Sequence, residues 1–254
     1  MAIAAKGGIE AVVGAMGGHG SSEGVQEQGC WALHNLALNA ENQVAIAAKG
    51  GIEAVVRVMG AHGSSAGVQE HGCMALCNLA ANAENQVAIA AKGGIEAVVR
   101  AMGGHGSSAA VQEYGCQALH NLALNVENQV TVASKGGIEA VVEAMSDHGS
   151  SAAVQERGCA ALVNLAANAE NKVAVAAKGG IEAVVRAMSG HGSSAAVQGY
   201  GCWALHNIAW SDSGRQSQVR EVGAVPLVQK AVAAFPNNAN IQKQGKGLLE
   251  KLGV

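Results

Sequence analysis

The chain has few aromatic residues and almost no proline: its 254 residues include three Trp, two Tyr, one Phe and two Pro. A compact domain of this length fills its core with large aromatic and branched side chains, so this composition argues against one. Lys and Arg form no run and the net charge is −3, which argues against a nucleic acid or an anionic membrane as partner. No apolar run approaches the roughly 18 residues of a membrane span, and the start lacks a signal-peptide pattern. The 49% hydrophobic content therefore predicts a soluble chain packed from small side chains.

A repeat of 43 residues dominates the sequence. The string Lys-Gly-Gly-Ile-Glu-Ala-Val-Val begins at residues 6, 49, 92, 135 and 178. Residues 49–91 and 92–134 are identical at 32 of 43 positions. We therefore read residues 1–254 as a single array of six repeats, in which residues 1–6 begin midway through a first helix. The repeats are a truncated 1–38, then 39–81, 82–124, 125–167, 168–211 and a diverged last repeat, 212–254.

Each repeat is expected to form three helices. In the repeat 39–81 the periodicity predicts helices over residues 42–48, 52–59 and 66–81. Apolar residues recur at i, i+3, i+4 and i+7 from Ile52 to Met59, as on one face of a helix. Asn39 or Asn42 can cap the first helix, and Gly50-Gly51 permits a sharp turn before the second. No segment alternates with period two, so no sheet is expected.

Two motifs carry a resemblance to a known family. They are Ala-x-Gly-Gly-Ile between helices one and two, and Val-Gln-Glu-x-Gly-Cys-Trp-Ala-Leu-His-Asn-Leu-Ala (Val25–Ala37) in helix three. Over essentially its full length the chain resembles the armadillo-repeat family, which includes importin-alpha and beta-catenin. The resemblance implies an all-α, right-handed armadillo-repeat α-solenoid with three helices per repeat of about 43 residues. A HEAT array, with two helices per repeat, fits the Gly-Gly break less well.

Cysteine and histidine recur at fixed phases of the repeat. Like positions in successive repeats stand roughly 10 Å apart, since helices pack 8–10 Å apart, and a disulfide needs Cα atoms within about 7 Å. We therefore expect buried, reduced thiols, which favours the cytoplasm or nucleus. The histidines that end the second helices are likewise too far apart to share a zinc ion. Catalysis needs unlike groups that converge, whereas this repeat aligns like groups, so we expect no metal, no cofactor and no enzymatic activity.

One asparagine recurs near the end of helix three. Its five copies are Asn35, Asn78, Asn121, Asn164 and Asn207. In one interpretation each amide bonds the backbone of a neighbouring repeat. The resemblance implies another, because importin-alpha and its relatives carry Trp-x-x-x-Asn there and bind an extended peptide in the concave groove through these amides. One amide offers both a donor and an acceptor, which matches a peptide unit. Trp31 and Trp203 complete the motif in this chain, while Met74, Gln117 and Ala160 replace the Trp in the middle repeats.

A second stripe of helix three changes at nearly every repeat. Three residues before the Trp position it reads Gln28, His71, Tyr114, Arg157 and Tyr200. Trp210 belongs to the same stripe and lies three residues after Asn207. Armadillo proteins that bind basic peptides often carry Glu at the first of these positions, so the resemblance disfavours a basic nuclear-localisation-type peptide. The preceding glutamates, Glu27, Glu70, Glu113 and Glu156, are expected to face solvent. A fixed core beside a variable face is typical of a recognition surface, with neutral drift as the alternative.

These patterns predict a protein-interaction scaffold that binds an extended or disordered protein segment through the asparagines and the exposed aromatics. The alternative is an engineered or consensus-derived array with no evolved ligand, because consensus repeats are readily designed. The first repeat has no evident polar cap. We therefore expect either a longer array or self-association through residues 1–38.

Overall fold

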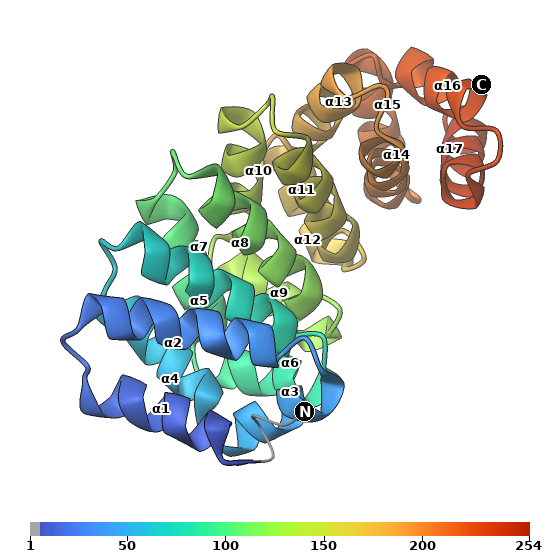
Figure 1. Cartoon of the computed structure of the whole chain (residues 1–254). Helices are drawn as coiled ribbons and strands as arrows, with labels where there is room; N and C mark the ends of the chain where they lie inside the picture. Colours follow the sequence, from blue (N-terminus) through green and yellow to red (C-terminus); the bar gives the residue numbers. More distant parts are fainter. Residues whose placement is uncertain (1–5) are drawn as a thin grey trace. The chain divides into compact units, whose positions relative to one another are not determined.

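The computed structural model describes residues 6–254, which form 17 helices and no strand (Figure 1). The predicted first-helix start in residues 1–5 lies outside the described residues. Contacts group the chain into two compact units, Met1–Gly137 and Ile138–Val254. Each unit is described by itself, and the single continuous array of six repeats stays a prediction.

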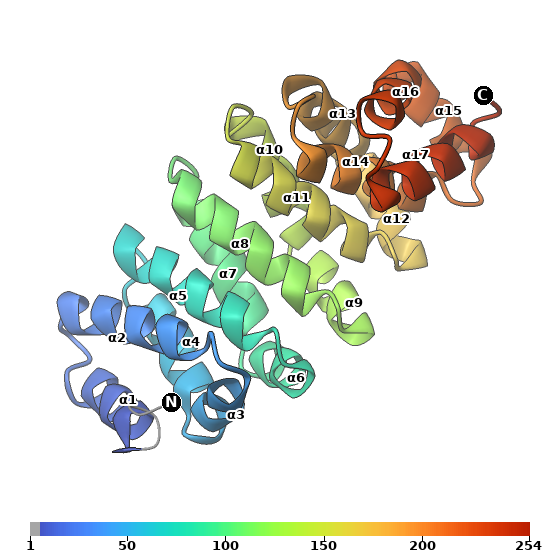
Figure 2. The same ribbon diagram turned by 45° about the vertical axis from the view of Figure 1, so that its right-hand side comes forward.

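The first unit stacks helices in three rows. Helices α2, α5 and α8 pack side by side, α1, α4 and α7 form the row behind them, and α3, α6 and α9 form the third (Figure 2). The predicted three helices per repeat are therefore confirmed. The helices are α1 (Gly8–Gly18), α2 (Glu23–Leu36), α3 (Ala40–Ala48), α4 (Gly51–Ala61), α5 (Ala66–Leu79), α6 (Ala83–Ala91), α7 (Gly94–Gly104), α8 (Ala109–Leu122) and α9 (Val126–Ser134).

The second unit repeats this order. Helices α11, α14 and α17 pack side by side, and α13 packs on α16. Ser211, in the turn before α15, has a φ of 56°, where the last repeat carries one extra residue. The helices are α10 (Gly137–Asp147), α11 (Ala152–Leu165), α12 (Ala169–Ala177), α13 (Gly180–Gly190), α14 (Ala195–Ala209), α15 (Ser213–Glu221), α16 (Ala224–Ala234) and α17 (Ala239–Lys251).

The Gly-Gly turn needs both glycines. Gly50 has a φ of 75°, in the left-handed region where a side chain is strained. A Cβ on Gly51 would lie 2.3 Å from Cγ2 of Ile46. Asn39 is the cap of α3, because its Oδ1 accepts from the backbone N–H of Asn42 at 3.0 Å. Asn42 instead donates its side-chain amide to the carbonyl of Leu36, at 2.9 Å.

The motif Val-Gln-Glu-x-Gly-Cys fixes helix three against helix two. The buried amide of Gln69 donates to the carbonyls of Met59 and His62, both at 3.0 Å, and so caps the end of α4. Gly72 lies under Met59, and a Cβ there would stand 2.6 Å from its Cγ. The cysteines of the motif are buried free thiols, as expected. Burial raises the pKa of Cys116 to about 12, so this thiol is neutral and unreactive at physiological pH.

Polar contacts also join successive repeats. In the first unit Lys49 pairs with Glu10 at 2.9 Å, and Lys92 with Glu53 at 2.9 Å. The histidine that ends the second helix does more than complement the helix dipole. Nε2 of His62 contacts the carbonyl oxygen of Gly20, in the preceding repeat, at 2.8 Å. In the first unit, side chains at fixed positions of the repeat therefore hold successive repeats together.

Candidate peptide-binding surface

In the first unit the asparagine row lies on α2, α5 and α8. The amide nitrogen of Asn78 donates to the carbonyl of His34 at 3.1 Å and contacts its Nδ1 at 3.0 Å. That of Asn121 donates to the carbonyl of Cys77 at 2.9 Å. Asn35, at the start of the row, donates to Trp31 within its own helix at 2.9 Å. The nitrogen side of the row therefore bonds backbone carbonyls, as in the first of the two interpretations of these residues.

The oxygen side of the same amides is different. Among the described residues, no hydrogen bond engages Oδ1 of Asn35, Asn78 or Asn121. Asn35 is exposed and the other two are half-buried. The sequence led us to expect that each amide offers a ligand both a donor and an acceptor. In the structure the amide nitrogens of Asn78 and Asn121 are already engaged within the protein. In the first unit the row presents acceptors.

The second unit carries the remaining two asparagines, Asn164 on α11 and Asn207 on α14, both half-buried. The amide nitrogen of Asn207 donates to the carbonyl of Val163 at 3.0 Å, and within residues 6–254 no hydrogen bond engages its Oδ1. Trp203 and Tyr200 lie on the same helix and are half-buried. The bonding pattern of Asn207 is therefore the same as that of Asn121.

The variable stripe of the first unit is accessible. Trp31 is 49% exposed, and its ring lies 6.4 Å from that of His71 on the next repeat, at an interplanar angle of 37°. The other stripe residues of this unit are exposed or half-buried. They are Gln28, Met74, Tyr114 and Gln117.

At the end of α14, one face of Trp210 is covered by the chain itself. The Nζ atom of Lys251 lies 3.6 Å from the centroid of the indole, in a cation–π contact. The ring of His206 meets the same indole edge-on at 5.3 Å. Burial lowers the pKa of His206, whose Nδ1 contacts Oε1 of Gln244 at 2.8 Å. Trp210 is still 46% exposed, so its free side is what remains for a ligand.

The structure corrects the expectation that the preceding glutamates face solvent. Glu27 is half-buried between α2 and α5, where its Oε1 lies 3.8 Å from Nδ1 of His71. A Cβ on Gly67 would stand 2.7 Å from its carboxyl carbon, so the side chain packs on the start of α5. Glu156 is half-buried and pairs with Arg157 at 3.3 Å. Both carboxylates therefore lie beside residues of the variable stripe, Glu27 beside His71 and Glu156 in an ion pair with Arg157.

A second apolar surface was not foreseen. Val44, Val87 and Val130 lie on α3, α6 and α9 and are 49%, 50% and 48% exposed. The available signal was the spacing Val44-x-Ile46, since residues two apart do not share one helix face. Ile46 is buried, so Val44 faces outward. The first unit therefore carries two accessible surfaces, the asparagine row and this valine row.

The residues that the structure describes contain neither a grouped set of metal ligands nor a membrane-spanning helix. Among residues 6–254, no three His, Cys, Asp or Glu side chains are grouped so that they hold a metal ion. No helix in the same range has both the length and the apolar character needed to cross a membrane.

Comparison with known proteins identifies the family. A family model described as LRRK2 ARM repeat matches residues 5–178. The crystal structure of an engineered protein is 26% identical, with 96% of each chain covered and a TM-score of 0.83. The designed armadillo repeat protein YIII(Dq)4CqI is 22% identical, with 96% of this chain and 99% of that chain covered and a TM-score of 0.83.

A further designed armadillo repeat protein, YIII(Dq.V1)4CPAF in complex with the peptide (KR)4, is 20% identical, with a TM-score of 0.80 over 96% of this chain and 99% of that chain. A search of curated proteins found no match. The armadillo-repeat match spans more than half of the sequence, and the helices follow its three-helix repeat. The chain therefore belongs to the armadillo-repeat family.

Proposed function

We propose that this chain is a non-enzymatic scaffold that binds an extended peptide segment along the faces of α2, α5 and α8 in the first unit. The faces of α11 and α14 form the corresponding surface of the second unit. The observation that carries the proposal is the row of unpaired Oδ1 atoms on Asn35, Asn78 and Asn121. A binding surface needs acceptors that repeat along one direction, because the backbone of an extended peptide presents its N–H groups in that way.

The amide nitrogens and oxygens have separate roles in this proposal. The nitrogens of Asn78 and Asn121 hold carbonyls of the preceding repeat, which fixes the direction of each Oδ1. A peptide N–H then donates to an oxygen that is already oriented, so little side-chain entropy is lost on binding. Each such bond contributes about 0.5–1.5 kcal/mol, so several in a row are needed for a stable complex.

The residues of the variable stripe beside the asparagine row favour a peptide ligand that is not polybasic. Its first positions are Gln28, His71 and Tyr114 in the first unit, and none of them is acidic. Exposed Trp31 offers an apolar contact for a ligand side chain. A designed armadillo repeat protein is in complex with (KR)4, which supports a peptide as the class of ligand. We propose a neutral, partly apolar segment for this chain because of its different stripe.

A second candidate is an engineered or consensus-derived scaffold without an evolved ligand. Two observations favour it: residues 49–91 and 92–134 agree at 32 of 43 positions, and an engineered protein is 26% identical over 96% of the chain. Consensus repeats of this kind fold from their own stacking and need no ligand.

An unbiased peptide-display screen distinguishes the two candidates. The first predicts selected extended peptides whose affinity falls about tenfold or more in the variant Asn78→Ala with Asn121→Ala, because two acceptors of the first unit's row are lost. Circular dichroism checks that the variant keeps its helices. Asn237→Ala, in the exposed turn before α17, is the matched control and leaves affinity unchanged. If no peptide is selected, or if the double variant binds as well as the original chain, the first candidate is rejected in favour of the second.

A further inference from the structure

A lysine–glutamate pair recurs at the junction between successive repeats, and the last junction lacks its lysine. In the second unit Lys178, the C-terminal cap of α12, pairs with Glu139 of the preceding repeat. The corresponding cap of α15 is Val222, which also precedes a left-handed glycine, Gly223 with a φ of 79°. The glutamate that faces this position is Glu182, in the first turn of α13. Its cationic partner is therefore missing from the chain.

The Glu182 carboxylate is poorly compensated by what surrounds it. Among residues 6–254 no ion pair engages it. Its Oε2 is buried without a hydrogen-bond partner, but so are the Oε2 atoms of Glu96 and Glu139, whose lysines pair through Oε1, so the difference at Glu182 lies at its Oε1. Its Oε1 accepts one long hydrogen bond, at 3.3 Å, from the side-chain amide of Gln218. A partly buried carboxylate with one weak neutral donor gains free energy from a charged donor, because charge-assisted hydrogen bonds are the stronger ones.

An open pocket of about 440 Å³ lies beside this carboxylate. Val173, Ala176 and Ala177 of α12 form an apolar wall, and Gly179, Glu182, Gln218 and Arg215 complete the lining. The size and the apolar wall suit an aliphatic stem, and the carboxylate suits a cation at its end. In the other junctions this position is taken by a lysine of the chain.

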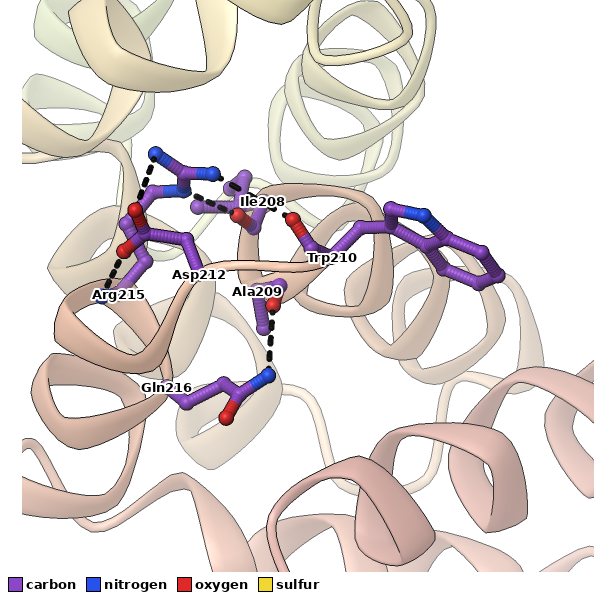
Figure 3. A network of polar contacts seen from close by, with 6 residues as sticks. All are labelled: Ile208, Ala209, Trp210, Asp212, Arg215 and Gln216. Carbon is purple, nitrogen blue, oxygen red and sulfur yellow. Dashed lines mark hydrogen bonds and ion pairs between the residues drawn. The ribbon is translucent and has the colours of Figure 1, made fainter.

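The guanidinium of Arg215 does not supply the missing charge. Its Nε donates to the carbonyl of Ile208 at 2.6 Å, and one of its terminal nitrogens pairs with Asp212 at 3.4 Å. Figure 3 shows this guanidinium held by Asp212 and by the carbonyls of Ile208 and Trp210. Arg215 thus anchors the turn before α15, and its charge is balanced by Asp212.

We propose that the pocket at Glu182 binds a primary ammonium group on an aliphatic stem, namely the lysine side chain of a partner protein. The ammonium group takes the place that Lys178 occupies at Glu139, and the stem lies against Val173 and Ala176. The pocket is formed by α12, α13 and α15, so the proposal is separate from peptide binding on the helix-three faces and does not depend on it.

The test titrates the full chain with Nα-acetyl-lysine-N-methylamide as the probe. Binding is measured by NMR as the chemical-shift change of the Gln218 side-chain amide and the Gly179 backbone amide. We expect a saturable shift of both signals. Glu182→Gln and Val222→Lys should each weaken binding about tenfold or more, the first by removing the charge and the second by filling the site with a lysine of the chain. Glu53→Gln, at a junction already filled by Lys92, is the matched control and leaves binding unchanged.

Two further probes sharpen the result. The Nε-acetylated form of the probe is neutral and should not bind, whereas 1,5-diaminopentane carries the same ammonium chemistry on a free diamine. Tighter binding of the lysine probe supports a protein lysine, and tighter binding of the diamine would overturn that assignment in favour of a free diamine. A shift that does not saturate, that the acetylated probe reproduces, or that survives Val222→Lys would overturn the site itself.

Discussion

At the scale of the residue, two positions of helix three, a glutamine and a glycine, hold this helix against helix two of the same repeat. The amide of Gln112 is buried and donates to the carbonyls of Met102 at 2.8 Å and His105 at 3.0 Å. Gly115 leaves room for Met102, whose Cγ would lie 2.5 Å from a Cβ at that position. Both residues therefore serve the packing of helix three on helix two within one repeat.

Loss of the glutamine should destabilise the fold. Gln112→Ala leaves two carbonyls at the end of α7 without their donor, so we expect the free energy of unfolding to fall by about 1–3 kcal/mol. Urea denaturation measures the change. Gln117→Ala, a half-buried position on the same helix, is the control and should change stability by less than about 0.5 kcal/mol. Equal effects of the two variants would contradict the capping role.

Two glycine substitutions should act in opposite directions. Gly115→Ala places a methyl group into Met102 and should cost about 1–3 kcal/mol. Gly103 is an exposed residue of α7, and no atom lies within 4 Å of a Cβ added there. Gly103→Ala should therefore stabilise the helix by about 0.5–1 kcal/mol. Thermal unfolding of both variants measures the difference. A stabilising Gly115→Ala would show that the close contact with Met102 is not a constraint.

At the scale of the element, lysine–glutamate pairs join the second helix of a repeat to the first helix of the next at every junction but the last. The hydrogen bond from Lys92 lowers the pKa of Glu53 below its ordinary value of 4.5, and Lys135 does the same for Glu96. In the folded state these carboxyls take up protons at a lower pH than in the unfolded state. Their contribution to stability is therefore complete above about pH 4.5 and is lost as the pH falls through the folded-state pKa.

This linkage predicts a small, pH-dependent effect of removing one lysine. Lys92→Met should reduce stability by less than about 1 kcal/mol at pH 7, since both partners are nearly half exposed and screened by solvent. The difference from the unchanged chain should shrink as the pH falls below about 4.5, and it should also shrink in about 1 M salt. Urea unfolding at pH 7 and at a series of lower pH values tests this. Lys230→Met is the control, because no ion pair engages Lys230 among residues 6–254. A difference that does not change with pH or salt would mean that the packing of the lysine side chain, and not its charge, stabilises the junction.

Elements and turns were predictable from the sequence because they depend on local residues. The Gly50-Gly51 turn, the Asn39 cap and the second helix of each repeat follow from backbone geometry and apolar periodicity. Contacts between repeats were harder to predict from the sequence. The direction of the Asn78 amide and the position of Glu27 depend on how far α2 and α5 stand from each other, which no single segment encodes. For that reason the sequence located the asparagine row but not which atoms of it are free.

At the scale of the whole molecule, the first repeat leaves accessible a face whose counterpart in the next repeat is buried. Val12 and Val25 are half-buried, whereas Val55 and Val68 at the same phases are fully buried. A pocket of about 330 Å³ lies on this face, lined by Val12, Val25 and their neighbours. Apolar surface of this kind favours association, because its removal from water is worth about 25 cal/mol per Å².

We therefore retain the expectation that the chain self-associates through residues 1–38. Light scattering should show a mass that rises with concentration, and Val25→Glu should lower it because a charge is then buried in the contact. Val44→Glu, on the exposed valine row, is the control and leaves association unchanged. A monomer at the highest accessible concentration would contradict the expectation.

The central claim is that an extended peptide lies on the asparagine row and not on the valine row. The most direct measurement is paramagnetic broadening by a display-selected peptide that carries a nitroxide label. We predict loss of the side-chain amide signals of Asn35, Asn78 and Asn121 and of the Trp31 indole signal. Broadening confined to the methyl groups of Val44, Val87 and Val130 would contradict the account and assign binding to the other surface.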